Sequence, residues 1–216
     1  MTMSDLGFER PKPSTRPYNS FIPSPELTTW ANSVFIKEKA PLYNPDHSHL
    51  LEAKIGFLWA YIPNQSQGKT TLGTAEQFNP QGNKWQVGRQ KQQIKNWFNY
   101  LWDSEKDIDI PDFIITLDAN WALTAKDNQF CAVVNHELTH CGQKRDLFGM
   151  PKFSSATGQP LYAIRKHDIE IFISDIELYG IDALSPEVSE AVEKAKRKPL
   201  MKMDSIYRAC GVCVSK

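Results

Sequence analysis

The stretch "NHELTHCG", residues 135–142, carries the pattern that decides the fold class and the chemistry of this chain. It contains His136, Glu137 and His140, which together form an H-E-x-x-H motif. Residues four apart lie one turn apart on the same face of a helix, so the two imidazoles point the same way. Such a pair binds one zinc ion, and the glutamate, about 100° further round the helix, reaches a water beside the ion. The motif therefore predicts a zinc site on a helix.

The residues around the motif predict a helix that lines a cleft. The preceding "LTAKDNQFCAVV" has a capping signal at Thr124 and Asp127, and Gly142 suits the end of the helix. On a helical wheel, four apolar residues form a stripe away from His136 that suits packing on a sheet: Phe130, Val134, Leu138 and Cys141. Small residues lie beside the histidines, where an ordinary amphipathic helix would carry charges. The alternative is a helix that carries two histidines and binds no metal.

A catalytic zinc takes three protein ligands and leaves a fourth position for water. The segment 162–180, "YAIRKHDIEIFISDIELYG", predicts a second helix with two apolar stripes, and His167 falls on one of them. We therefore expect His167 to be the third ligand. Glu170 is a rival, and Asp168 or Glu170 is a candidate for holding a ligand histidine by its other ring nitrogen. A further alternative makes His167 a packed core histidine.

Patterns elsewhere predict a mixture of strands and helices. We expect strands over 69–78 and 112–121, a helix running into a strand over 47–63, and helices over 24–40, 86–106 and 185–198. Residues 1–23 are polar and rich in proline, which predicts an extended or disordered arm. The chain thus divides into an arm over 1–23, a main domain over 24–184, and a C-terminal helix and tail over 185–216.

Composition narrows the choice of partners and compartment. The 216 residues are 41% hydrophobic, enough for one sizeable core, and 25 basic residues balance 25 acidic ones. Bulk charge thus gives no reason to expect a nucleic-acid or membrane partner. The sequence shows neither a secretory signal nor an apolar stretch that would span a bilayer, so we expect a cytoplasmic protein with reduced thiols. The tail "CGVC", Cys210 to Cys213, has the spacing of half a zinc knuckle or a redox pair.

Several motifs together resemble the phage metallopeptidases, a zincin-like family of phages and mobile elements. The strand ending in "DANW" is followed in order by "NHELTH", "DLFGMP", "HDIEIF" and "YG", and the upstream "HSHLLEAKIGFLW" is similar too. The resemblance covers about residues 47–182 and is specific at seven positions: His136, Glu137, His140, His167, Asp168, Glu170 and Phe172. The chain departs from it at Ile171, where the family usually has a second glutamate. The resemblance implies a zincin-like α+β fold for 24–184, in which a small, mostly antiparallel sheet packs on the active-site helix beside a second ligand-bearing helix. It also implies a zinc-dependent peptidase activity.

Residues and resemblance together predict a zinc metallopeptidase that acts on protein or peptide substrates. Zinc would acidify a water, and Glu137 would take the proton from that water and pass it to the leaving group. We expect the sheet edge near 112–121 to pair with an extended substrate. Candidates for stabilising the oxyanion are Tyr162, Arg165 and Tyr179. Alternatives are a zinc-containing binding module, acting through the basic segment 194–202, and another zinc hydrolase of the amidase type.

Overall fold

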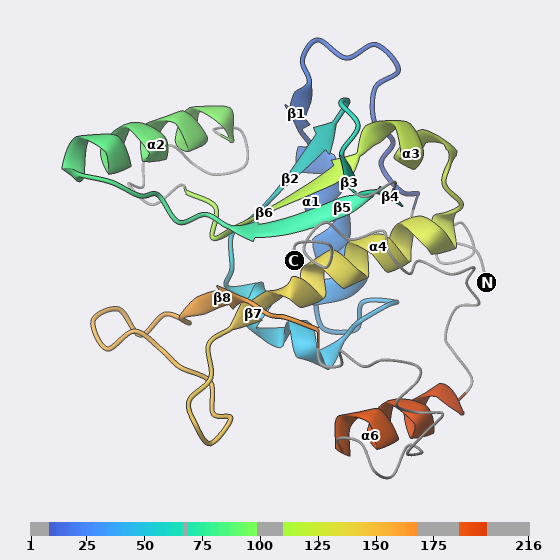
Figure 1. Cartoon of the computed structure of the whole chain (residues 1–216), viewed down its shortest axis with the longest axis vertical. Coiled ribbons are helices and arrows are strands. Elements are labelled where there is room, and N and C mark those ends of the chain that lie inside the picture. The colour runs from blue at the N-terminus through green and yellow to red at the C-terminus, as the bar shows by residue number, and fades with distance from the viewer. Residues whose placement is uncertain (1–8, 67–68, 99–109, 168–185, 198–216) are drawn as a thin grey trace.

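A four-stranded sheet is the centre of the fold (Figure 1). The computed structural model describes residues 9–66, 69–98, 110–167 and 186–197. The sheet has the order β1-β2-β6-β5, and its strands are β1 (Phe21–Pro23), β2 (Ile55–Ala60), β5 (Gly73–Gln77) and β6 (Phe113–Asp118). β2 and β6 run parallel, while β1 pairs with β2 and β5 with β6 in antiparallel fashion. The expected α+β class with a mostly antiparallel sheet is confirmed.

The two central strands are apolar on both faces. All six residues of β2 are buried, and β6, with the sequence FIITLD, is buried at four of its six positions. Continuous apolar runs of this kind belong to strands covered on both sides. Because β6 has β2 on one side and β5 on the other, our expectation of a free sheet edge at 112–121 is wrong. In the described part of the chain, the edge on this side of the sheet is β5.

The expected helices appear in the predicted order with different bounds, and a further short helix forms over Ala119–Thr124, where the end of a strand was expected. The first is α1 (Pro25–Ala31), whose N-cap Ser24 accepts a hydrogen bond from the backbone N–H of Leu27, and it runs on into a π-helical turn, η2 (Asn32–Ile36). Next come the 3-10 helix η3 (Pro45–Leu51), α2 (Lys84–Trp97), α3 (Ala119–Thr124), α4 (Asp127–His140) and α6 (Pro186–Ala195). The histidine motif thus lies at the C-terminal end of α4, as expected.

Two short hairpins complete the described elements. β3 (Gln65–Ser66) pairs with β4 (Lys69–Thr70), so the strand expected over 69–78 is split in two. β7 (Cys141–Gln143) pairs with β8 (Tyr162–Ile164). Our expectation of a helix from residue 162 is therefore wrong at its start, because the chain there is drawn into a ladder with β7. The rest of that expected helix, from residue 168, lies outside the described residues.

The main core lies between the sheet and α4. Phe130 of α4 is fully buried and has three tryptophan rings around it at centroid distances of 5.6–6.1 Å: Trp30, Trp59 and Trp121. The apolar stripe expected on this helix is confirmed, because all four of its members are 0% exposed: Phe130, Val134, Leu138 and Cys141. Aromatic rings bring large buried areas and so fix how the helix lies on the sheet.

The described part of the N-terminal arm is tied to this core. Residues 9–20 contain no helix or strand, but Phe21–Pro23 add β1 to the sheet. The Arg10 side chain is 4% exposed, lies 4.7 Å from the Phe130 ring centroid and pairs with Asp127 at 2.8 Å. It also donates to the carbonyls of Ala122 and Ala125 at 2.9 and 2.7 Å. Arg10 thus fastens the arm to the junction of α3 and α4.

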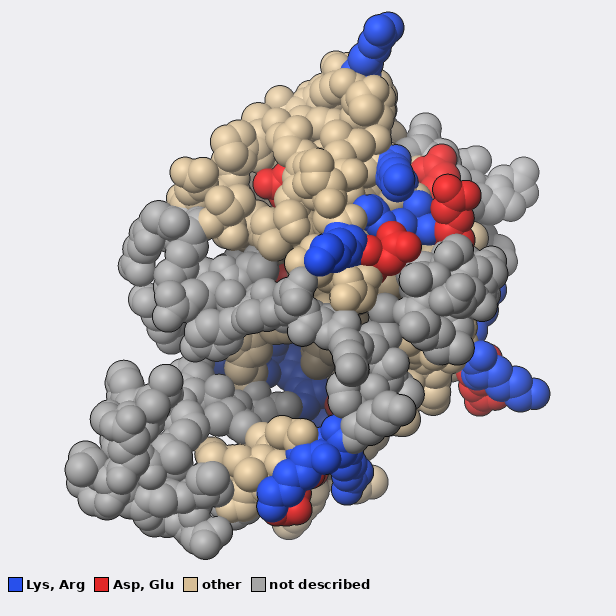
Figure 2. Space-filling view, turned by 90° about the vertical axis from the view of Figure 1, so that its right-hand side faces the viewer, with Lys and Arg blue, Asp and Glu red and all other residues tan. Residues whose placement is uncertain are grey.

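Charges of both signs mix on the surface. On the face drawn in Figure 2, coloured basic and acidic side chains lie next to one another. This agrees with the equal totals of the sequence. None of the described helices has both the length and the apolar character that crossing a membrane requires.

Candidate metal centre

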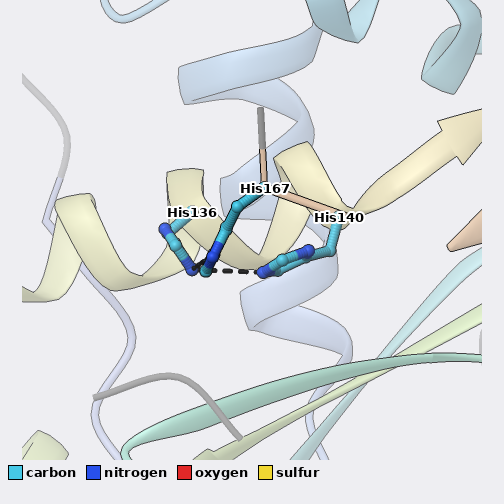
Figure 3. Close-up of side chains that lie close together, drawn as sticks. All are labelled: His136, His140 and His167. Atoms are coloured by element: carbon cyan, nitrogen blue, oxygen red, sulfur yellow. Dashed lines mark hydrogen bonds between the residues drawn. The ribbon is translucent and has the colours of Figure 1, made fainter. Parts of the chain in front are cut away.

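The C-terminal turn of α4 carries the two motif histidines on one face. Their rings lie edge to face with centroids 4.8 Å apart, and Figure 3 shows both pointing into the same space. His140 is 3% exposed and His136 is half-buried. The i, i+4 spacing therefore places the two imidazoles as the motif predicts.

His167 reaches this space through the β7–β8 ladder. α4 ends at His140 and the chain passes directly into β7, where Cys141 pairs with Ile164 of β8. The backbone N–H of Arg165 then donates to the carbonyl of His140 at 2.8 Å, so the return strand is bonded to the end of the helix itself. Three residues beyond β8, the exposed His167 lies with its ring centroid 5.2 Å from that of His136 and 5.1 Å from that of His140.

The distances among the three rings fit a metal ion. The Nε2 atom of His136 lies 3.2 Å from that of His140 and 3.4 Å from that of His167. One potential ligand atom from each of the three residues can be chosen so that all lie within 4.8 Å of one another. Nitrogen ligands at 2.0–2.1 Å from a tetrahedral zinc lie about 3.3 Å apart. The two Nε2 separations from His136 match that value.

The protonation of His140 also suits a ligand. Its Nδ1 lies 2.7 Å from the carbonyl oxygen of Arg165. A carbonyl only accepts, so Nδ1 carries the hydrogen and Nε2 keeps its lone pair directed at the cluster. Burial lowers the pKa of His140 and lowers that of His136 to about 4. Both rings are therefore neutral at pH 7, the form in which histidine binds metal.

Two further histidines, which the sequence analysis did not single out, support the end of α4 from η3. His49 Nε2 lies 2.7 Å from the carbonyl oxygen of Cys141, at the point where the helix becomes β7. His47 is fully buried, and its Nε2 lies 3.2 Å from the hydroxyl of Thr139. All five histidines of the chain thus gather here. The signal was the "HSH" of residues 47–49, which the sequence analysis used for a helix and for the family resemblance but not for the site.

Glu137 packs against the edge strand β5. Its side chain is 0% exposed. A Cβ atom built on Gly73 would lie 2.9 Å from both Cγ and Oε1 of Glu137, closer than real Cβ contacts come. Only a glycine at position 73 leaves this carboxylate where it is. The glutamate of the motif is therefore held between α4 and β5.

Tyr162 and Arg165, two of the candidates for stabilising the oxyanion, both make contacts with residues outside the histidine cluster. Tyr162 packs against Phe113 in the core with ring centroids 5.3 Å apart, and Arg165 pairs with Asp46 at 3.3 Å. The buried Cys141 has a pKa raised well above the usual range by burial and by the nearby Glu137, which keeps its thiol protonated. Seven residues named from the sequence lie outside the described residues: Asp168, Glu170, Ile171, Phe172, Tyr179, Cys210 and Cys213.

Fold and site together define an α+β protein with a three-histidine candidate metal centre beside a buried glutamate. The chain belongs to the family described as "Putative phage metallopeptidase", which it matches over residues 28–196. The match contains the whole stretch on which the resemblance rests and leaves the "CGVC" tail outside. Searches of the curated proteins and of the solved structures found no match to this chain.

Proposed function

We propose that this protein is a zinc metallopeptidase with a zincin-like fold. One observation carries the proposal: the Nε2 atom of His136 lies 3.2 Å from that of His140 and 3.4 Å from that of His167, as ligands of a tetrahedral zinc would, and the next residue on the helix is the buried Glu137. Membership of the phage metallopeptidase family supports it. The ligands would be His136, His140 and His167, and a bound zinc would acidify water and polarise a peptide carbonyl.

Glu137 is the base and acid in this proposal. The carboxylate is buried and lies against Gly73 on β5, so it need not be ordered when substrate arrives. Glu137 would take a proton from the attacking water and return it to the leaving amine. His140 keeps its Nδ1 hydrogen on the carbonyl of Arg165, which fixes the direction of its other nitrogen.

The β5 edge would hold the peptide substrate beside Glu137. Hydrogen bonds from Asp118 N to Leu72 O and from Phe78 N to Asp112 O flank the β5–β6 ladder. Opposite residues in an antiparallel pair alternate between bonded and non-bonded, so Gly73 and Ala75 turn their backbone groups away from β6. An extended peptide can pair with such an edge. That peptide would then pass Gly73, the residue that packs on Glu137.

Proteomic cleavage profiling of the wild type against Glu137→Gln tests the proposal. The wild type should cut, and Glu137→Gln should retain about one zinc per chain while losing hydrolysis. Equal cleavage by both proteins would rule out the role of Glu137. His136→Ala should lose most of the zinc, and unchanged metal content would refute the site.

The third ligand needs its own comparison. His167→Ala should weaken zinc binding, whereas Glu170→Ala should leave it unchanged. Zinc lost only from Glu170→Ala would show that the ligand is the glutamate. Both variants are read by metal content, so the result does not depend on knowing a substrate.

A further inference from the structure

The segment between β7 and β8 presents large apolar side chains to solvent. Relative exposures are 100% for Leu147, 89% for Phe148, 61% for Met150 and 54% for Phe153. We call residues 144–153 the finger. It projects from the body at the lower left of Figure 1. Neighbouring exposed apolar residues of this size commonly mark a surface that binds another molecule.

The tip of the finger is held in a defined turn. The Asp146 carboxylate accepts hydrogen bonds from the backbone N–H groups of Phe148 and Met150 at 2.8 and 2.9 Å. Arg145 donates to the carbonyl of Gly149 at 2.8 Å, and Gly149 has a φ of 78°, which favours glycine. The apolar side chains are therefore presented by an ordered turn, and a partner pays little to order it.

Basic groups surround the apolar tip. Lys144, Arg145 and Lys152 are all exposed. The one acidic residue of the finger, Asp146, has an oxygen committed to the turn. A partner that buries the apolar tip and is attracted by the basic residues around it, which we call the basic rim, would carry both apolar and acidic side chains.

The stem of the finger joins it to the proposed substrate path. Lys144 N donates to Leu161 O at 2.7 Å, and Lys152 N donates to Lys144 O at 2.8 Å, so the base is a bonded extension of the β7–β8 hairpin. β8 also meets the far end of β5, where the Gln77 amide donates to the carbonyl of Tyr162 at 3.2 Å. A chain lying along β5 from Gly73 toward Gln77 thus arrives at the hairpin that carries the finger.

We propose that the finger is a docking site for an apolar, acidic segment of the protein substrate, next to the segment that enters the metal centre. This rests on the proposed peptidase function for the identity of the partner. The apolar tip supplies affinity, and the basic rim selects acidic segments. Short peptides that fill only the metal centre would not reach it.

The test measures binding to the full-length Glu137→Gln protein, so that nothing is cut. The probe is fluorescently labelled α-lactalbumin, reduced and carboxymethylated, which is acidic and unfolded. Leu147→Ser with Phe148→Ser should weaken binding by about tenfold or more, because burying one large apolar side chain is worth at least that factor. Lys144→Glu with Lys152→Glu should also weaken it, and the loss should be smaller at high salt. Zinc content should stay at the wild-type level in both.

Trp85→Ser is the matched control, because Trp85 is 87% exposed on α2, away from the hairpin. It should bind as the parent does. Equal weakening by Trp85→Ser, unchanged binding in the finger variants, or no binding by the parent would each overturn the proposal. So would finger-dependent sedimentation with phosphatidylserine vesicles in place of protein binding, since that would make the finger a membrane anchor. Finger-dependent protein binding without any cleavage by the wild type would refute the peptidase function and leave the docking site standing.

Discussion

Replacing Gly73 by alanine should separate catalysis from metal binding without touching any proposed ligand. The added Cβ would lie 2.9 Å from Cγ and Oε1 of Glu137 and 3.1 Å from Cδ2 of Leu117. Ordinary contacts begin at 3.4 Å, so the groups must separate by about 0.5 Å (3.4 − 2.9). Glu137 is 0% exposed and Leu117 is too, so neither can swing into solvent.

The expected cost follows from that displacement. Overpacking a dense core by one methyl group destabilises by about 1–3 kcal/mol. A base moved by a large fraction of an ångström loses alignment with the water it must deprotonate, and an error of about 1 Å can cost about a hundredfold in rate. We expect the turnover of Gly73→Ala to fall by about 10- to 100-fold. Zinc stoichiometry should be unchanged because none of the three atoms nearest to the added Cβ belongs to a histidine.

Three measurements on one preparation check this: turnover on a peptide taken from the cleavage profile, zinc per chain, and the free energy of unfolding in urea. Gly88→Ala is the control, because a Cβ at that position in α2 meets nothing within 4 Å. It should keep full activity and gain up to about 1 kcal/mol of stability from helix propensity. Wild-type turnover in Gly73→Ala would refute the argument that β5 fixes the base.

Three further perturbations test the supports of the site. His47 is fully buried, and burial lowers its pKa from 6.5 to about 4. As pH falls, the unfolded chain therefore binds a proton at His47 before the folded protein does. The stability that this difference contributes is present above pH 6.5 and is lost toward pH 4, with about 2 kcal/mol lost by pH 5. Urea unfolding of the metal-free protein should show this fall. His47→Gln should make the fall smaller without removing it, because burial also lowers the pKa of His136 and of His140. An identical slope in the variant would contradict the assignment. His49→Ala removes the contact with the Cys141 carbonyl and should weaken zinc binding by about tenfold in a chelator competition. His49→Asn, whose amide can donate to the same carbonyl, should bind zinc more tightly than His49→Ala. Arg10→Ala deletes three hydrogen bonds, to Asp127, Ala122 and Ala125, and should lower the free energy of unfolding by about 2–3 kcal/mol. Arg10→Lys should recover little of that loss, because one ammonium group cannot reach all three acceptors. A loss below about 0.5 kcal/mol in Arg10→Ala would show that Arg10 does not fasten the arm.

The sequence predicts the helix of the motif well because its signal is local. The wheel position of Phe130 or Leu138 depends only on the helical repeat, and both are buried as expected. The apolar run of β6 likewise identifies a strand. Its place in the sheet, between β2 and β5, depends on pairings with residues some 40 to 60 positions away, and no local pattern carries that information.

His167 lies in the histidine cluster, but not for the reason that the sequence suggested. We selected it because it falls on an apolar stripe of an expected helix, yet it is exposed and lies beyond a strand. The amphipathic pattern from residue 162 competes with the ladder that Cys141–Gln143 offers, and along Tyr162–Ile164 the ladder wins. Its part as a ligand stays a prediction. The contribution of His49 was equally hidden, because it depends on a carbonyl 92 residues away.

Because α4 passes directly into β7, the segment between β7 and β8 can change without moving the histidine cluster. The ladder between Cys141–Gln143 and Tyr162–Ile164 closes before the chain departs into residues 144–161, so the span between is anchored at both ends by backbone bonds. Lengthening a closed loop costs little free energy, growing only with the logarithm of its length. Loops of other lengths or sequences can therefore be grafted between Lys144 and Leu161 while the three imidazoles keep their positions. A recombinant library built at these two joints would vary recognition and leave the chemistry alone.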